Sequence, residues 1–167
     1  MIEIITGDLL TAPEQYIVHQ TNCVTTKGGG LAHFLFAKFP YADVYASRTP
    51  EDCEVATLRD KPGDIIVSGN GQDQRYIINL MGQLYPGGFW DDMPEDNETM
   101  RHKFFYNGLL KIAKLKDLKS IAFPWKIGCG LAGGHWDYYY GVLDNFNFYV
   151  RETYGTKVVI YRREGDE

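Results

Sequence analysis

Short apolar runs alternate along this chain with polar, glycine-containing loops. Runs of this length, bounded by glycine, proline or asparagine, are typical of strands buried in a sheet. We expect strands at residues 2–5, 16–20, 63–68, 75–80, 120–124 and 157–161. Gly69, Asn70 and Gly71 separate the third and fourth of these runs, which predicts a hairpin and hence some antiparallel pairing.

Three other stretches have the pattern of helices. The first, residues 31–39, has apolar side chains at the i, i+3, i+4 spacing and ends at Pro40. The second, residues 97–119, can be capped by Asn97 and carries lysines towards its end. The third, residues 135–149, is rich in aromatic side chains. Strands interleaved with helices indicate an α/β fold, and 167 residues suit one domain, residues 1–167, with a solvated tail from about residue 162.

The densest group of glycines lies in the sequence IGCGLAGGHW, residues 127–136, between an expected strand and an expected helix. Glycine has no Cβ atom, so the backbone can adopt positive φ, approach a ligand closely and turn its N–H groups towards an anion. The N-terminus of the following helix adds partial positive charge at the same place. The segment is therefore a candidate phosphate-binding loop; the alternative is a glycine-rich turn without a ligand.

Two further loops share this arrangement. Residues 21–30 (TNCVTTKGGG) follow the second strand and end at the start of a helix, and residues 82–94 (GQLYPGGFWDDMP) follow the fourth strand. Aromatic residues of the latter loop could cover a ligand, or could only anchor a surface loop. Three such loops in one chain favour a ligand with a diphosphate group.

Charge and cysteine content narrow the possible partners. A net charge of −5 and a pI near 5.4 argue against general binding to nucleic acid, which requires many lysine and arginine contacts. Anion binding must then depend on backbone N–H groups.

The three cysteines have no metal-ligand spacing, so we expect neither disulfides nor a metal, and no cofactor. No apolar run approaches the length of a membrane span and no secretion signal opens the chain, so we expect no membrane partner and a cytoplasmic location.

Two residues are candidates for recognition or chemistry. Asp8 lies in the turn after the first strand, where its carboxylate could contact a ligand or could simply cap the turn. His19 lies at the end of a buried strand, where it could transfer protons or could be a hydrogen-bonded core residue.

The order of these motifs resembles the macro domain over nearly the whole chain. The matching segments are GDL at 7–9, VHQTN at 18–22, GGGLA at 28–32, Pro124 and IGCGLAGG at 127–134 followed by Trp136. The pattern is most similar to the yeast-type ADP-ribose 1″-phosphate phosphatases and is related to the terminal ADP-ribose glycohydrolases.

This resemblance implies an α/β fold, a three-layer α/β/α sandwich with a mixed central sheet, that binds ADP-ribose over its strand ends. Asp8 would accept from the adenine amino group beside the Leu9 N–H, Asn22 would hold the distal ribose, and the two glycine loops would surround the diphosphate. The implied substrate-binding residues are Asp8, Leu9, Asn22, Gly28, Gly29, Gly30, Leu31, Gly128, Cys129, Gly130, Leu131, Ala132 and Gly133.

Departures from the family pattern bear on activity. Gln83 stands where the glycohydrolase branch has a lysine, and Ala132 where it has an aspartate. An amide is not nucleophilic and an alanine cannot transfer a proton. His19 matches the histidine of the phosphatase branch, so we expect it to be the catalytic acid or base.

Its acidic partner is left open among Asp91, Asp92 and Asp137. We therefore expect a monomeric phosphatase that acts on ADP-ribose 1″-phosphate. The alternatives are a non-catalytic ADP-ribose reader and, with less support, a glycohydrolase that removes ADP-ribose from protein or nucleic acid.

Overall fold

A six-stranded mixed sheet forms the centre of the computed structural model, which describes residues 1–167. The strands, in chain order, are β1 (Glu3–Thr6), β2 (Tyr16–Thr21), β3 (Ile65–Ser68), β4 (Tyr76–Met81), β5 (Ser120–Pro124) and β6 (Lys157–Arg162). Their order in the sheet is β1-β6-β5-β2-β4-β3. Neighbouring strands are parallel except β3 and β4, which form the expected antiparallel hairpin.

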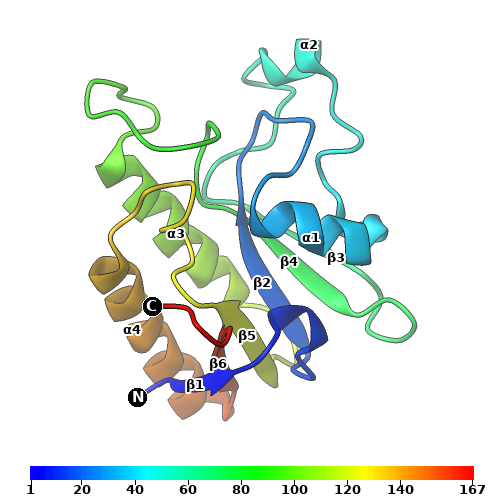
Figure 1. Ribbon diagram of the computed structural model, residues 1–167, viewed down its shortest axis with the longest axis vertical. Coiled ribbons are helices and arrows are strands. Elements are labelled where there is room, and N and C mark those ends of the chain that lie inside the picture. The colour runs from blue at the N-terminus through cyan, green and yellow to red at the C-terminus, as the bar shows by residue number, and fades with distance from the viewer.

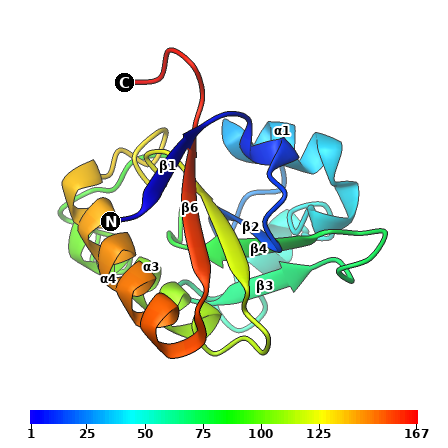
Figure 2. The same ribbon diagram turned by 90° about the horizontal axis from the view of Figure 1, so that it is seen from below.

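Helices cover both faces of this sheet (Figure 1). Helices α3 (Glu98–Ile112) and α4 (Trp136–Tyr154) pack on one face, and α1 (Leu31–Lys38) packs on the other, as the view in Figure 2 also shows. Three short elements, η1 (Leu9–Thr11), η2 (Pro40–Ala42) and α2 (Pro50–Cys53), lie in the connections. The predicted three-layer α/β/α sandwich with a mixed central sheet is confirmed.

The central strands explain why the sequence shows continuous apolar runs. In β2, Val18 belongs to the core under α3 and α4, whereas its neighbour Ile17 belongs to the core under α1. A parallel strand buried on both faces needs apolar residues at consecutive positions rather than at alternate ones. The sheet is therefore well fixed beneath the loops that follow its strands.

Two helix boundaries differ from the sequence predictions. Helix α3 ends at Ile112 instead of continuing to residue 119: the N–H groups of Lys114 and Leu115 bond to carbonyls three residues back rather than four. Asp117 then has a left-handed φ of 54° in the turn that leads into β5. Helix α4 continues to Tyr154, and Gly155 ends it with a left-handed φ of 71°. Glycine is the residue that most readily takes this conformation at a helix end.

The C-terminal residues stay close to the loop after β5. The Arg162 guanidinium Nε donates to the carbonyl of Asp166 at 2.8 Å, and the Trp125 indole donates to the carbonyl of Glu167 at 3.0 Å. The segment predicted as a solvated tail from about residue 162 is largely exposed, but Arg162 still belongs to β6 and Arg163 takes part in the cleft described below. None of the helices has the length and apolar character needed to span a membrane.

Candidate functional site

A cleft of about 730 Å³ lies at the carboxyl ends of four strands. Its walls come from the segments that follow β2, β4, β5 and β6. The adjacent strands β2 and β5 lead to helices on opposite faces of the sheet, α1 and α4. Because these helices lie on opposite faces, the loops that follow β2 and β5 run away from each other. Open α/β sheets bind ligands in the crevice between two loops that diverge in this way.

The charge of the cleft lining is opposite in sign to the net charge of the chain. Three cationic residues line the cleft, namely Lys27, Lys126 and Arg163, and no aspartate or glutamate does so. The chain as a whole carries a net charge of −5. The cleft therefore suits an anionic ligand.

The loop after β5 offers backbone donors to this cleft. The N–H groups of Gly130, Leu131 and Ala132 have no acceptor within the protein, although all three residues line the cleft. The Gly130 carbonyl, by contrast, accepts from the N–H of Gly133 at 3.0 Å. A turn whose donors are unpaired while its carbonyl is satisfied is a favourable environment for phosphate oxygens.

The second glycine loop leads directly into α1. Gly30 occupies the N-cap position with a φ of 55°, and no side chain caps the helix. The first N–H groups of a helix have no intrahelical acceptor, so those of Leu31 and Ala32 are available at the cleft wall. Gly28 and Gly29 line the same wall. The predicted placement of these glycines at a helix N-terminus is confirmed.

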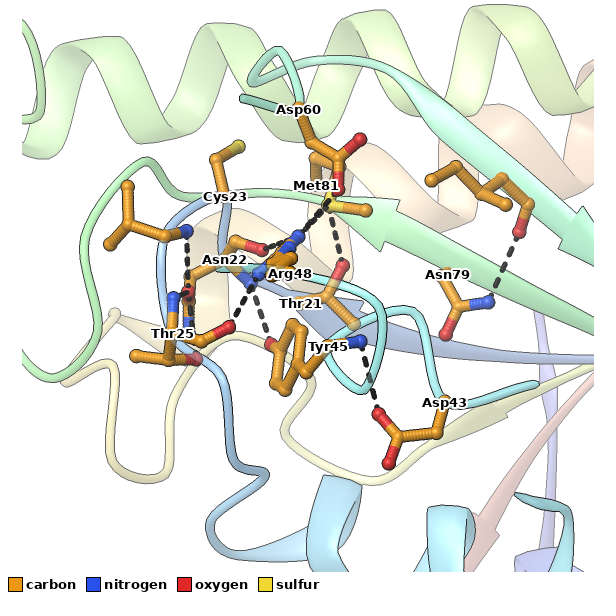
Figure 3. A network of polar contacts seen from close by, with 12 residues as sticks. Thr21, Asn22, Cys23, Thr25, Asp43, Tyr45, Arg48, Asp60, Asn79 and Met81 are labelled. Atoms are coloured by element: carbon orange, nitrogen blue, oxygen red, sulfur yellow. Dashed lines mark hydrogen bonds and ion pairs between the residues drawn. The ribbon is translucent and has the colours of Figure 1, made fainter. Parts of the chain in front are cut away.

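Asn22, expected to hold the distal ribose, is fixed by local hydrogen bonds (Figure 3). Its Oδ1 accepts from the N–H groups of Val24 and Thr25, at 3.1 and 2.9 Å, and from the Thr25 hydroxyl at 3.0 Å. Its own N–H donates to the Tyr45 hydroxyl at 2.9 Å. Three donors on Oδ1 leave the amide Nδ2 as the polar atom that can donate to a ligand hydroxyl.

Four of the expected binding residues, Asp8, Leu9, Cys129 and Gly133, do not line the cleft. Asp8 caps η1, because its Oδ1 accepts from the Leu10 N–H at 2.9 Å. Asp8 follows Gly7, whose N–H donates to the carbonyl of Arg162, the residue before the cleft residue Arg163. Burial raises the pKa of the Cys129 thiol to about 11, so this sulfur is a neutral thiol and not a nucleophilic thiolate.

Replacing Asp8 separates its capping role from ligand recognition. Asp8→Ala removes a charged acceptor, and we expect ADP-ribose affinity to fall about ten- to a hundredfold, as for the loss of a charge-assisted hydrogen bond of about 1.5–3 kcal/mol. Asp8→Asn keeps an oxygen for the Leu10 N–H and should restore stability but not affinity. Calorimetry and thermal melts of both variants measure the two effects. Unchanged affinity in Asp8→Ala would leave Asp8 with the capping role alone.

His19 is buried beneath α1, with 1% of its surface exposed. Its Nε2 contacts Asn79 Oδ1 at 2.7 Å, and its ring packs edge-on against Phe36. The Asn79 amide nitrogen donates to Ile66 and Ser68, so Oδ1 is the atom that faces the imidazole. Nε2 therefore carries the hydrogen, and Nδ1 is a buried acceptor without a protein partner.

Burial lowers the pKa of His19 from 6.5 to about 4, against the opposing hydrogen bond to Asn79. The ring is therefore neutral at pH 7. A neutral imidazole with a free Nδ1 lone pair can accept a proton but has no acidic proton to give. The general acid/base role expected from the sequence is restricted by this environment to that of a base.

The same pKa predicts a pH dependence of stability. Above about pH 6.5 His19 is neutral in both the folded and the unfolded chain; below it the unfolded chain binds the proton more readily, so stability falls as the pH drops towards 4. At about 1.4 kcal/mol per pH unit, the parent should lose about 2 kcal/mol more than His19→Gln between pH 7 and pH 4.5. Urea unfolding at the two pH values measures the difference. Equal losses would contradict a buried, neutral His19.

The acidic side chains considered as partners of His19 do not enter the cleft. Asp91 and Asp92 are exposed in the loop after β4, Asp137 is exposed in the first turn of α4, and none of them lines the cleft. The residue that contacts His19 is Asn79, an amide on the neighbouring strand β4. Sequence reasoning missed Asn79, since only the pairing register of β2 and β4 brings it opposite His19.

Gln83 is held in place by hydrogen bonds at both ends of its amide. Its Oε1 accepts from Gln20 Nε2 at 2.8 Å, and its Nε2 donates to the carbonyls of Tyr85 and Gly87, at 2.8 and 3.3 Å. The position that matches the lysine of the glycohydrolase branch is therefore occupied by a fixed, non-nucleophilic group. Ala132 lines the cleft and adds no ionisable group.

Comparison with known proteins defines the class to which this arrangement belongs. The family model described as "Macro domain" matches residues 18–140, which include both glycine loops. The chain is 32% identical over 141 residues to an uncharacterised protein of Thermoplasma volcanium, covering 80% of this chain and 67% of that one. The chain therefore belongs to the macro domain family, whose fold binds and processes ADP-ribose.

Solved structures agree with this assignment. The macrodomain of Thermus aquaticus DarG is 26% identical, with a TM-score of 0.67 over 97% of this chain and 98% of that one. A mutant macrodomain of Oceanobacillus iheyensis with ADPR is 18% identical, with a TM-score of 0.62 over 96% of this chain and 83% of that one. At that identity the second likeness concerns the fold alone.

Proposed function

We propose that the cleft binds ADP-ribose and its derivatives, and that the protein removes the terminal phosphate of ADP-ribose 1″-phosphate. The observation that carries the binding proposal is the run of unpaired N–H groups on Gly130, Leu131 and Ala132. These donors line a cleft that holds three cationic side chains and no carboxylate. The oxygens of a diphosphate accept hydrogen bonds from backbone N–H groups and cationic side chains. Because the loop that carries these N–H groups is preorganised, little free energy is lost in reorienting them on binding.

The phosphatase proposal depends on His19. Its unpaired Nδ1 is buried, but His19 lines the cleft; a water molecule admitted at this point of the wall would give its proton to Nδ1 as the water oxygen attacks the terminal phosphorus. The bond between phosphorus and the oxygen on C1″ then breaks, which releases phosphate and ADP-ribose, and solvent supplies the proton for the departing oxygen. Backbone N–H groups around the phosphate stabilise the charge that develops during this step.

The alternative function is that of a reader, which binds ADP-ribose without turnover. Two observations favour it: no carboxylate lines the cleft, and burial makes His19 a weak base. A glycohydrolase has less support, because Gln83 cannot attack the sugar and is fully hydrogen-bonded.

Phosphate release from ADP-ribose 1″-phosphate by the purified protein distinguishes the two functions. Stoichiometric formation of phosphate and ADP-ribose by the parent, and its loss in His19→Ala prepared in the same way, supports the phosphatase and excludes a contaminating enzyme. Saturable ADP-ribose binding without phosphate release identifies a reader. Release of ADP-ribose from an ADP-ribosylated protein would contradict both.

A further inference from the structure

Arg101, on α3, is one of the most deeply buried side chains in the molecule, with 2% of its surface exposed. Its guanidinium forms two bonds to the Asp96 carboxylate, from Nε to Oδ1 at 3.1 Å and from Nη2 to Oδ2 at 2.8 Å. Asp96 is itself fully buried and also accepts from the N–H groups of Leu84 and Tyr85. The carboxylate neutralises the arginine, so Arg101 does not attract a ligand by its net charge.

The remaining donors of Arg101 go to backbone carbonyls of two different loops. In the loop after β4 they reach Gly87 at 2.7 Å and Tyr85 at 3.2 Å. In the loop after β5, Nη1 donates to the carbonyl of Ala132 at 3.3 Å. Gly87 and Ala132 both line the cleft. A single guanidinium therefore joins the two loops that form separate parts of the cleft wall.

The bond from Arg101 to the Ala132 carbonyl is important because the loop after β5 carries the proposed diphosphate donors. Ala132 belongs to the turn from Gly130 to Gly133, whose unpaired N–H groups are the proposed diphosphate donors. Gly130 has no atom of the rest of the protein within 4 Å of the place where a Cβ would lie, so side-chain packing does not restrain that end of the turn. The bond from Arg101 is thus the side-chain restraint on this turn, beside the backbone bonds from Gly133 to Gly130 and from Gly134 to Gly128.

We propose that Arg101, paired with Asp96, is a positioning residue for ligand binding: it holds the loops after β4 and β5 at the separation that the diphosphate of ADP-ribose requires. This inference rests on the proposed function, although Arg101 itself does not line the cleft. The planar fork of an arginine can satisfy a carboxylate and two loops at once, whereas a lysine has one nitrogen for all of them.

Arg101→Lys is the informative variant, because it keeps a cation beside the buried Asp96. We expect Arg101→Lys to weaken ADP-ribose binding about tenfold or more. The hydrogen-bonded amides of the two loops should exchange with deuterium about ten times faster in the free protein; these are the amides of Leu84, Tyr85, Cys129 and Gly133. Arg75→Lys is the matched control. Arg75 also donates to two carbonyls, those of Ala12 and Glu14, but it lies just before β4, at the end of the sheet away from the cleft.

Arg75→Lys should lower the melting temperature without changing affinity or exchange in the two loops. An affinity loss in Arg101→Lys that only matches that of Arg75→Lys, or loop exchange equal to the parent's, would overturn the proposal. Deuterium exchange is measured without ligand, so it tests the positioning role even if the parent fails to bind ADP-ribose, an outcome that would refute the proposed function instead. If Arg101→Lys does not fold, Arg101→Met combined with Asp96→Asn, which removes both buried charges, is used in the same comparison.

Discussion

His19→Ala is expected to lower the kcat for phosphate release from ADP-ribose 1″-phosphate by about 10²- to 10⁴-fold, the usual contribution of a positioned base. ADP-ribose affinity should stay near the parental value, because His19 is 1% exposed and its Nε2 is already bonded to Asn79. The kcat comes from initial rates of phosphate release at saturating substrate, and the affinity from calorimetry.

His102→Ala is the matched control for this prediction. His102 is partly buried whereas His19 is fully buried, but burial lowers the pKa of both; the ring of His102 stacks on Tyr138 outside the cleft. Both variants should lose stability, but only His19→Ala should lose turnover. Parental kcat in His19→Ala would remove His19 from the mechanism; a parallel loss of affinity and melting temperature would assign it a role in the core.

Gly130→Val is expected to weaken ADP-ribose binding about 100-fold while leaving the fold intact. Gly130 does not have a positive φ, and a Cβ added there would meet no protein atom within 4 Å, so the new side chain would occupy space at the cleft. A ligand that uses the Gly130 N–H would then meet the valine, and overpacking of this kind costs about 1–3 kcal/mol. Calorimetry and a thermal melt give the two quantities.

Gly141→Val makes the same change in equally open surroundings on α4, away from the cleft. It should bind ADP-ribose as the parent does. Binding by Gly130→Val at parental strength would show that the ligand does not approach this loop, which would also undermine the role given to Arg101.

The strands of the sheet could be predicted from the sequence because a strand buried on both faces needs apolar residues at consecutive positions. Ser120–Pro124 is apolar at consecutive positions since both faces of β5 are covered, and its predicted limits match those of the structure. The helix ends were less predictable. Asp117 has a left-handed conformation between α3 and β5, and residues 113–119 contain no glycine or proline that would signal the helix end.

The glycine loops could be predicted because glycine is required where backbone approaches a ligand or another backbone. Gly128 has a φ of 78°, and a Cβ there would lie 2.7 Å from the ring of Tyr139. The residues that hold these loops could not be found in the same way. Arg101 lies on a helix for which the sequence predicts no site residue, and Asn79 lies within an apolar strand, so their contacts exist only after the chain has folded.

The central claim, that this cleft binds ADP-ribose, is tested most directly by calorimetric titration of the parent protein with ADP-ribose. The unpaired N–H groups of Gly130, Leu131 and Ala132, together with the cationic cleft lining, predict saturable one-to-one binding. The expected dissociation constant is in the micromolar range, which corresponds to about −7 to −8 kcal/mol. No heat of binding and no thermal shift at millimolar ADP-ribose would contradict the account.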